Sequence, residues 1–138
     1  MTVIGAIIEW LKGFNSEGWK MSKIDTDIQG PKIDTFSLVK EPTQIVKRYI
    51  SGKAIYTDHY MVQARLASNE DIDRAENHGF GEALEEYVRT RSKAGDYPEI
   101  PGAVVKSVDI TTPFYLGSTN NNSSVYQMTI AIKYEKEN

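Results

Sequence analysis

The sequence predicts an α+β fold in which two helices pack on a mainly antiparallel sheet. Two segments carry apolar residues at helical spacing, and several others alternate apolar with polar residues as half-buried strands do. The strand segments follow one another through short turns, which favours antiparallel pairing. With 138 residues, of which 40% are hydrophobic, the chain is long enough for one domain, residues 1–138, with its own core.

The first helix is expected from Thr2, whose hydroxyl is suited to capping a helix start. Gly13 should end this helix, and Phe14 should fold back onto its apolar side. That side is formed by five residues at helical spacing, Val3, Ile4, Ile7, Ile8 and Leu11.

Residues 15–31 show little periodicity and contain Gly18, Gly30 and Pro31, so they are expected to form an irregular connection. Long connections inside a domain often have a function. This one is a candidate contact arm, with Trp19 as its candidate contact residue.

Strands are expected at residues 33–40, 45–50 and 54–66. Pro42 should stop the first of them, because proline cannot donate a ladder hydrogen bond. The second and third should form a hairpin around Ser51 and Gly52, where glycine supplies the positive φ of a tight turn.

A second helix is expected over residues 70–93, with Ser68 and Asp71 forming a capping box. Gly95 and Pro98 should end it. Gly79 and Gly81 lower the helix propensity by about 1 kcal/mol each relative to alanine, which favours a kink or break near residue 80.

The last part of the chain should hold two further strands. Residues 104–110 read as a strand that stops before Pro113, and residues 126–134 show the clearest alternation in the chain. The polar segment 117–124 between them is expected to be a flexible loop, with Asn120, Asn121 and Asn122 as candidate contact residues.

Composition and motifs argue against most kinds of chemistry. Sixteen Lys and Arg against 19 Asp and Glu give a net charge of −3, which does not favour sequence-specific nucleic-acid binding. The absence of cysteine excludes thiolate chemistry, and the sequence has neither a signal peptide nor the run of about 20 apolar residues that a spanning helix needs. We therefore expect a non-secreted protein that does not contact a membrane and needs no cofactor.

Metal and catalytic sites are not expected either. Asp25, Asp27 and Gly30 match three positions of a calcium loop, but Phe36 stands where the loop needs a bidentate glutamate. His59 and His78 have no partner at ligand spacing. No nucleophile elbow or phosphate loop occurs, so the sequence predicts no enzyme.

The charges are distributed unevenly along the chain. Residues 1–69 carry nine basic and seven acidic side chains, a net charge of +2, whereas residues 70–138 carry seven and 12, a net charge of −5. Such an asymmetry can orient contacts between copies, although it is also common on ordinary solvated surfaces. The candidate subunit-interface residues are the cations Lys47, Arg48 and Lys53 and the acids Glu76, Glu82 and Glu86.

Several segments, in their order along the chain, resemble the minor capsid proteins of tailed phages from Gram-positive hosts. They are residues 49–52, residues 76–80 leading into 85–87, Tyr97-Pro98, and the strand at 126–134. The resemblance covers residues 36–136, with Ser51 where the family often has Asp and Tyr87 where it often has Trp. The α-β-α-β layout is also similar to that of phage tail terminators.

The resemblance implies a virion structural protein of the tail or neck, assembled in the cytoplasm of the bacterial host. Such a protein caps the tail tube as a homo-oligomeric ring, typically a hexamer, stops tube polymerisation and presents the surface to which the head docks. Its implied partners are further copies of itself and the tail tube protein, with the sheath and head-completion or connector proteins as further candidates. Another neck or head–tail connector protein, a headless tail-like particle, and a soluble binding module or enzyme stay open as alternatives.

Overall fold

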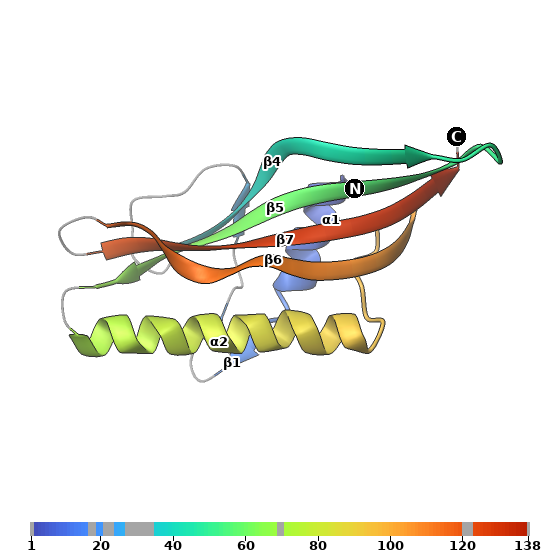
Figure 1. Cartoon of the computed structure of the whole chain (residues 1–138). Helices are drawn as coiled ribbons and strands as arrows, with labels where there is room; N and C mark the ends of the chain where they lie inside the picture. The colour runs from blue at the N-terminus through green and yellow to red at the C-terminus, as the bar shows by residue number, and fades with distance from the viewer. Residues whose placement is uncertain are drawn as a thin grey trace.

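The computed structural model describes residues 2–16, 19–20, 24–26, 35–68, 71–119 and 123–137 (Figure 1). Two helices and seven strands follow one another in these residues. The elements are α1 (Val3–Leu11), β1 (Asn15–Ser16), β2 (Trp19–Lys20), β3 (Ile24–Thr26), β4 (Thr35–Arg48), β5 (Lys53–Ala67), α2 (Asp71–Lys93), β6 (Val104–Thr119) and β7 (Ser123–Glu137).

Five strands form the main sheet in the order β3-β4-β5-β7-β6. All neighbours are antiparallel except β3 and β4, which pair in parallel over three residues. β7 therefore lies between β5 and β6, and its 15 residues pair with β5 along its whole length. The expected α+β class, with a mainly antiparallel sheet and two helices, is confirmed.

Both helices pack on the same face of the sheet, and the core lies between them and the strands. The alternating residues of β5 and β7 supply the floor of this core, where Tyr60 pairs with Ile130 and Val62 pairs with Met128. Figure 1 views the other face, so that α1 passes behind the strands while α2 runs along the β6 side. Fully burying one large apolar side chain contributes roughly 1.5–3 kcal/mol, so this face dominates the stability.

The first helix begins and ends as expected. The Thr2 hydroxyl accepts a hydrogen bond from the amide of Gly5 at 3.0 Å, and α1 ends at Leu11. Phe14 folds back into the core, where its ring meets those of Phe80 and Tyr87 edge-on.

Two strands are longer than expected because both run through a proline. β4 continues past Pro42 to Arg48 and so joins the two strands expected at 33–40 and 45–50, and β6 continues past Pro113 to Thr119. Both strands lie at the outer side of the sheet in these stretches, and their registers shift between Lys40 and Gln44 and between Thr112 and Tyr115. Proline is tolerated at edges and bulges because no ladder bond is lost there. The flexible loop expected at residues 117–124 is correspondingly wrong for 117–119 and 123–124, which belong to strands.

The helix α2 is continuous from Asp71 to Lys93, so the kink expected near residue 80 is wrong. Gly81 is used for a close approach rather than for a break: a Cβ built on it would lie 2.1 Å from the Phe114 ring. The hydroxyl of Ser68, the residue expected to cap this helix, accepts a hydrogen bond from the Ser124 hydroxyl at 2.8 Å.

The expectation of an irregular connection at residues 15–31 is also partly wrong. β1 and β2 form a small antiparallel pair, and β3 joins the edge of the main sheet beside Phe36, Ser37 and Leu38. These strands have only two or three residues each, too few to show a recognisable alternation.

Candidate functional site

The cations singled out in the sequence lie at one corner of the sheet, where β4 turns into β5. The turn is closed by hydrogen bonds from the amide of Tyr49 to the carbonyl of Lys53 at 2.9 Å and from the amide of Gly52 to the carbonyl of Tyr49 at 3.1 Å. Gly52 has a φ of 92°, which glycine adopts without strain. Ile50 is fully exposed at the tip, and the side chains of Ile45 and Tyr49 are 57% and 43% exposed. We call the surface formed by the exposed side chains of residues 45–53 the cationic corner.

The three cations of this corner have different surroundings. The Lys47 ammonium lies 5.5 Å from the centre of the Tyr49 ring, a cation–π distance, and Arg48 is exposed. Lys53 instead lies 3.4 Å from Glu135, which also binds Lys106 at 3.2 Å. Hydrogen bonds from these two lysines hold the pKa of Glu135 below its usual range. Lys47 and Arg48 therefore remain the cations available for an external contact.

The outer edge of β4 beside this corner is open. Within the described parts of the chain, β3 covers β4 only at Phe36–Leu38, and no strand pairs with its outer side beyond that point. The amide of Tyr49 bonds to β5, so the alternation of an antiparallel ladder directs the backbone groups of Gln44, Val46 and Arg48 away from the sheet. These unpaired groups can accept a partner.

The opposite edge of the sheet, β6, is covered by α2. The Ser92 hydroxyl donates a hydrogen bond to the carbonyl of Val108 at 2.7 Å, and the amide of Phe114 donates one to the Glu85 carboxylate at 3.1 Å. Side chains of α2 thus satisfy two outward-facing backbone groups of β6. The two edges of the sheet are therefore different: α2 covers the β6 edge, whereas β4 beyond Leu38 has no outer strand partner among the described residues.

The predicted acids lie on α2, but the structure brings only two of them together. Glu82 and Glu86 are exposed and one turn apart, whereas Glu76, also exposed, lies about 120° round the helix from Glu82 at roughly 100° per residue. Glu86 accepts a hydrogen bond from Thr90 at 3.2 Å. Leu116 of β6, two residues beyond the Phe114 that packs on Gly81, is 48% exposed. We call Glu82 and Glu86 the acidic surface.

These two surfaces lie on opposite edges of the sheet. In Figure 1 the turn from β4 to β5 is at the far right, beyond the upper edge of the sheet, whereas α2 runs below β6. The strand order separates them, because β5 and β7 intervene between β4 and β6. The candidate cations and acids therefore do not meet within one copy of the chain.

The remaining candidate contact residues lie largely outside what the structure describes. Trp19 belongs to the two-residue strand β2, and its side chain is not among the described ones. Asn120, Asn121 and Asn122 fall in the segment between β6 and β7 that lies outside the described residues.

A buried carboxylate at the base of the corner was not expected from the sequence. Asp58 is 1% exposed and accepts hydrogen bonds from Gln44 and, at 2.8 Å, from the hydroxyl of Tyr134. Burial and the hydrogen bond to Asp58 raise the pKa of Tyr134. Gln44 is the first residue of β4 to pair again after the register shift, so these bonds fix the strand that leads to the corner. The alternation of β5, continued backwards from Tyr60, places Asp58 on the buried face and was the available signal.

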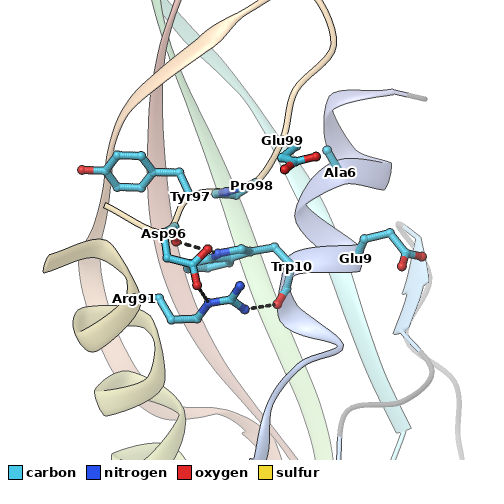
Figure 2. Close-up of a pocket in the computed structure, with 8 residues that line it drawn as sticks. All are labelled: Ala6, Glu9, Trp10, Arg91, Asp96, Tyr97, Pro98 and Glu99. Carbon is cyan, nitrogen blue, oxygen red and sulfur yellow. Dashed lines mark hydrogen bonds and ion pairs between the residues drawn. The ribbon is translucent and has the colours of Figure 1, made fainter. Parts of the chain in front are cut away.

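A pocket between the ends of the two helices is the other feature that the sequence did not predict (Figure 2). Arg91 crosses it, donating to Asp96 at 2.8 Å and to the carbonyl of Trp10 at 2.9 Å. The guanidinium carbon lies 5.0 Å and 5.1 Å from the ring centres of Trp10 and Tyr87. The pocket is lined by Ala6, Glu9, Trp10, Arg91, Asp96, Tyr97, Pro98 and Glu99.

Two further bonds show that this pocket is a joint between the helices. The Trp10 indole donates to the carbonyl of Asp96 at 2.9 Å, and the Tyr87 hydroxyl donates to the carbonyl of Trp10 at 2.7 Å. The hydrogen bond from Arg91 lowers the pKa of Asp96, and burial raises the pKa of Tyr87. The Arg91 guanidinium is thus already engaged by the protein itself, and its role is to hold α1 against α2.

In the described part of the chain, no group of three or more His, Cys, Asp or Glu side chains is arranged to hold a metal ion. None of the described helices is both long and apolar enough to cross a bilayer. No model of a known protein family and no curated protein matches the sequence.

Proposed function

We propose that this protein is a structural subunit of a phage virion or a phage-tail-like particle: a tail terminator that caps the tail tube as a ring, stops its polymerisation and presents the docking surface for the head. The observation that carries the proposal is the separation of two complementary surfaces on opposite edges of one sheet. A ring requires such an arrangement, since each subunit must offer one surface to one neighbour and a different surface to the other.

The resemblance of residues 36–136 to minor capsid proteins and tail terminators supports the same role. The open edge of β4 and the exposed apolar tip at Ile50 add to this support, because both are surfaces that a partner would cover. The proposed partners are further copies of the chain, most simply six in a ring, and the tail tube protein. Sheath and head-completion proteins are further proposed partners, and the proposed location is the tail or neck of the particle, reached by assembly in the host cytoplasm.

The test is whether the protein caps tubes. The purified protein is added to tube protein that is polymerising, with both taken from the same phage or particle, and tube length and tube ends are followed by negative-stain microscopy. We expect shorter tubes, each closed at one end by a ring, and free rings of tube diameter at high protein concentration. Tubes that keep growing uncapped at saturating protein would contradict the proposal.

The same experiment separates the alternative of another neck or head–tail connector protein. A connector is expected to form a ring that binds portal or head protein but leaves tube growth unchanged. Both roles use the same two surfaces for ring formation, so only the axial partner distinguishes them.

A further inference from the structure

We infer that the cationic corner of one copy docks on the acidic surface of the next, so that α2 is held between its own β6 edge and the neighbour's open β4 edge. This inference rests on the proposed ring and names the contact that would close it. The occupant of the open edge is therefore a second copy of this chain.

The first argument is charge. Successive residues of a strand point to opposite faces, so Lys47 and Arg48 straddle the edge of β4, and a helix that approaches edge-on can contact both. Glu82 and Glu86 are one turn apart on α2, where neighbouring side chains lie about 5–6 Å from each other. On the same side of the helix, at roughly 100° per residue, Arg89 and Lys93 follow these two acids. The acidic surface is thus limited to the middle of α2, on the β6 edge of the sheet, whereas its own cationic corner lies on the β4 edge.

The second argument is the backbone edge itself. On the inner side of α2, Glu85 already accepts a hydrogen bond from an outward-facing strand amide, that of Phe114. The outward-facing amides of Gln44, Val46 and Arg48 on the neighbour offer donors of the same kind. Carboxylates on the outer side of α2 are suited to accept them, with charge-assisted bonds that are stronger than neutral ones.

The third argument is the exposed apolar surface on the two edges of the sheet. Single exposed apolar side chains are common, but four large ones occur among six residues of the corner: Ile45, Val46, Tyr49 and Ile50. On the β6 edge, Leu116 is 48% exposed. Both edges therefore combine charged side chains with exposed apolar area.

Charge reversal on each side tests this contact. One variant carries Lys47→Glu with Arg48→Glu, and the other carries Glu82→Lys with Glu86→Lys. Each variant alone should need at least a tenfold higher protein concentration to assemble rings. Ring assembly is measured by light scattering and by the capping of tubes. Raising the salt concentration should weaken the wild-type ring, because exposed charge pairs are screened.

Mixing the two variants is the decisive step. In a ring in which the two variants alternate, every reversed corner meets a reversed helix, and every native corner meets a native helix. All contacts are then complementary, and a ring with an even number of copies can alternate throughout. The equimolar mixture should therefore recover assembly. Lys12→Glu with Lys133→Glu changes the net charge by the same amount as the corner variant at exposed sites elsewhere, and should assemble as the wild type does.

The outcomes separate this inference from the proposed function. If either reversal variant forms rings and caps tubes as the wild type does, or if the mixture fails to recover while each variant stays folded by circular dichroism, the contact is wrong and the terminator role stands. If the corner variant forms rings but no longer binds tubes, the corner contacts the tube protein and the inference is overturned. If the wild type neither forms rings nor caps tubes, the proposed function fails first.

Discussion

Gly81 lies on the face of α2 that packs against the sheet, where a Cβ would be 2.1 Å from the Phe114 ring. The ring is itself fixed, because it stacks on Tyr126 at 5.3 Å and meets Phe80 at 5.6 Å. A side chain at residue 81 would therefore push the helix away from β6.

We expect Gly81→Ala to lower the free energy of unfolding. Overpacking costs roughly 1–3 kcal/mol, which exceeds the gain of at most about 1 kcal/mol in helix propensity. Denaturant unfolding measures the change. The double variant with Phe114→Ala should lose less than the sum of the two single losses, because removing the ring makes room for the methyl group. An alanine variant as stable as the wild type would show that the close approach is not maintained in solution.

Asp96 gives the joint between the helices a dependence on pH. Its pKa is lowered in the folded protein by the hydrogen bond from Arg91, so its contribution to stability is present above the unfolded value of about 3.9. That contribution is lost as the pH falls through the lower folded value.

Asp96→Asn should therefore flatten the acid limb of the stability profile. Thermal unfolding of both proteins is measured from about pH 6 to about pH 2.5, a range that begins above the ordinary pKa of an aspartate and ends below it. The wild type should lose more of its melting temperature below pH 4 than the variant does, since the asparagine does not titrate. Parallel acid limbs would show that the bond between Arg91 and Asp96 contributes nothing to stability.

At the scale of the elements, α2 acts as the cover of the β6 edge, and Glu85 is one of the two side chains that bond to this edge. Glu85→Ala leaves the amide of Phe114 unpaired, which should cost about 1–3 kcal/mol of unfolding free energy. Glu85→Gln keeps an acceptor oxygen at the same position and should cost clearly less. Denaturant midpoints of the two variants make the comparison, and equal losses would mean that water replaces the carboxylate.

The same elements show what the sequence could and could not predict. Alternation predicted β5 and β7, strands were also predicted within β6 and, as two separate pieces, within β4, and the Thr2 cap predicted the start of α1, because these signals are local. The strand ends predicted at Pro42 and Pro113 were wrong. Proline interrupts a strand only where a neighbouring strand would accept a hydrogen bond from the residue's amide, and whether a strand lies at an edge depends on the strand order. The predicted kink in α2 was wrong because the partner of Gly81 is 33 residues away in sequence, at Phe114.

The two edges of the sheet carry opposite charges, and this arrangement could not be predicted from the residues. The sequence singled out the cations of the corner and the acids of α2, but their positions depend on β7 inserting between β5 and β6. The hairpin expected around Ser51 and Gly52 is part of the sheet at this scale. β5 is backed by β7 as far as Lys53, so the corner belongs to the sheet and only its turn extends beyond it. A surface carried on a sheet is held more rigidly than one on a free hairpin.

The central place of β7 has a consequence for synthesis. β5 and β6 both pair with β7, and β7 is the last of the three to leave the ribosome. Until residues 123–137 have been made, β5 has β4 as its only long partner and β6 has none in the sheet. Pairing over such sequence separations is slow and leaves strand edges exposed. The nascent chain should therefore complete its sheet only after residues 123–137 have left the ribosome, and copies should become competent to associate no earlier than that.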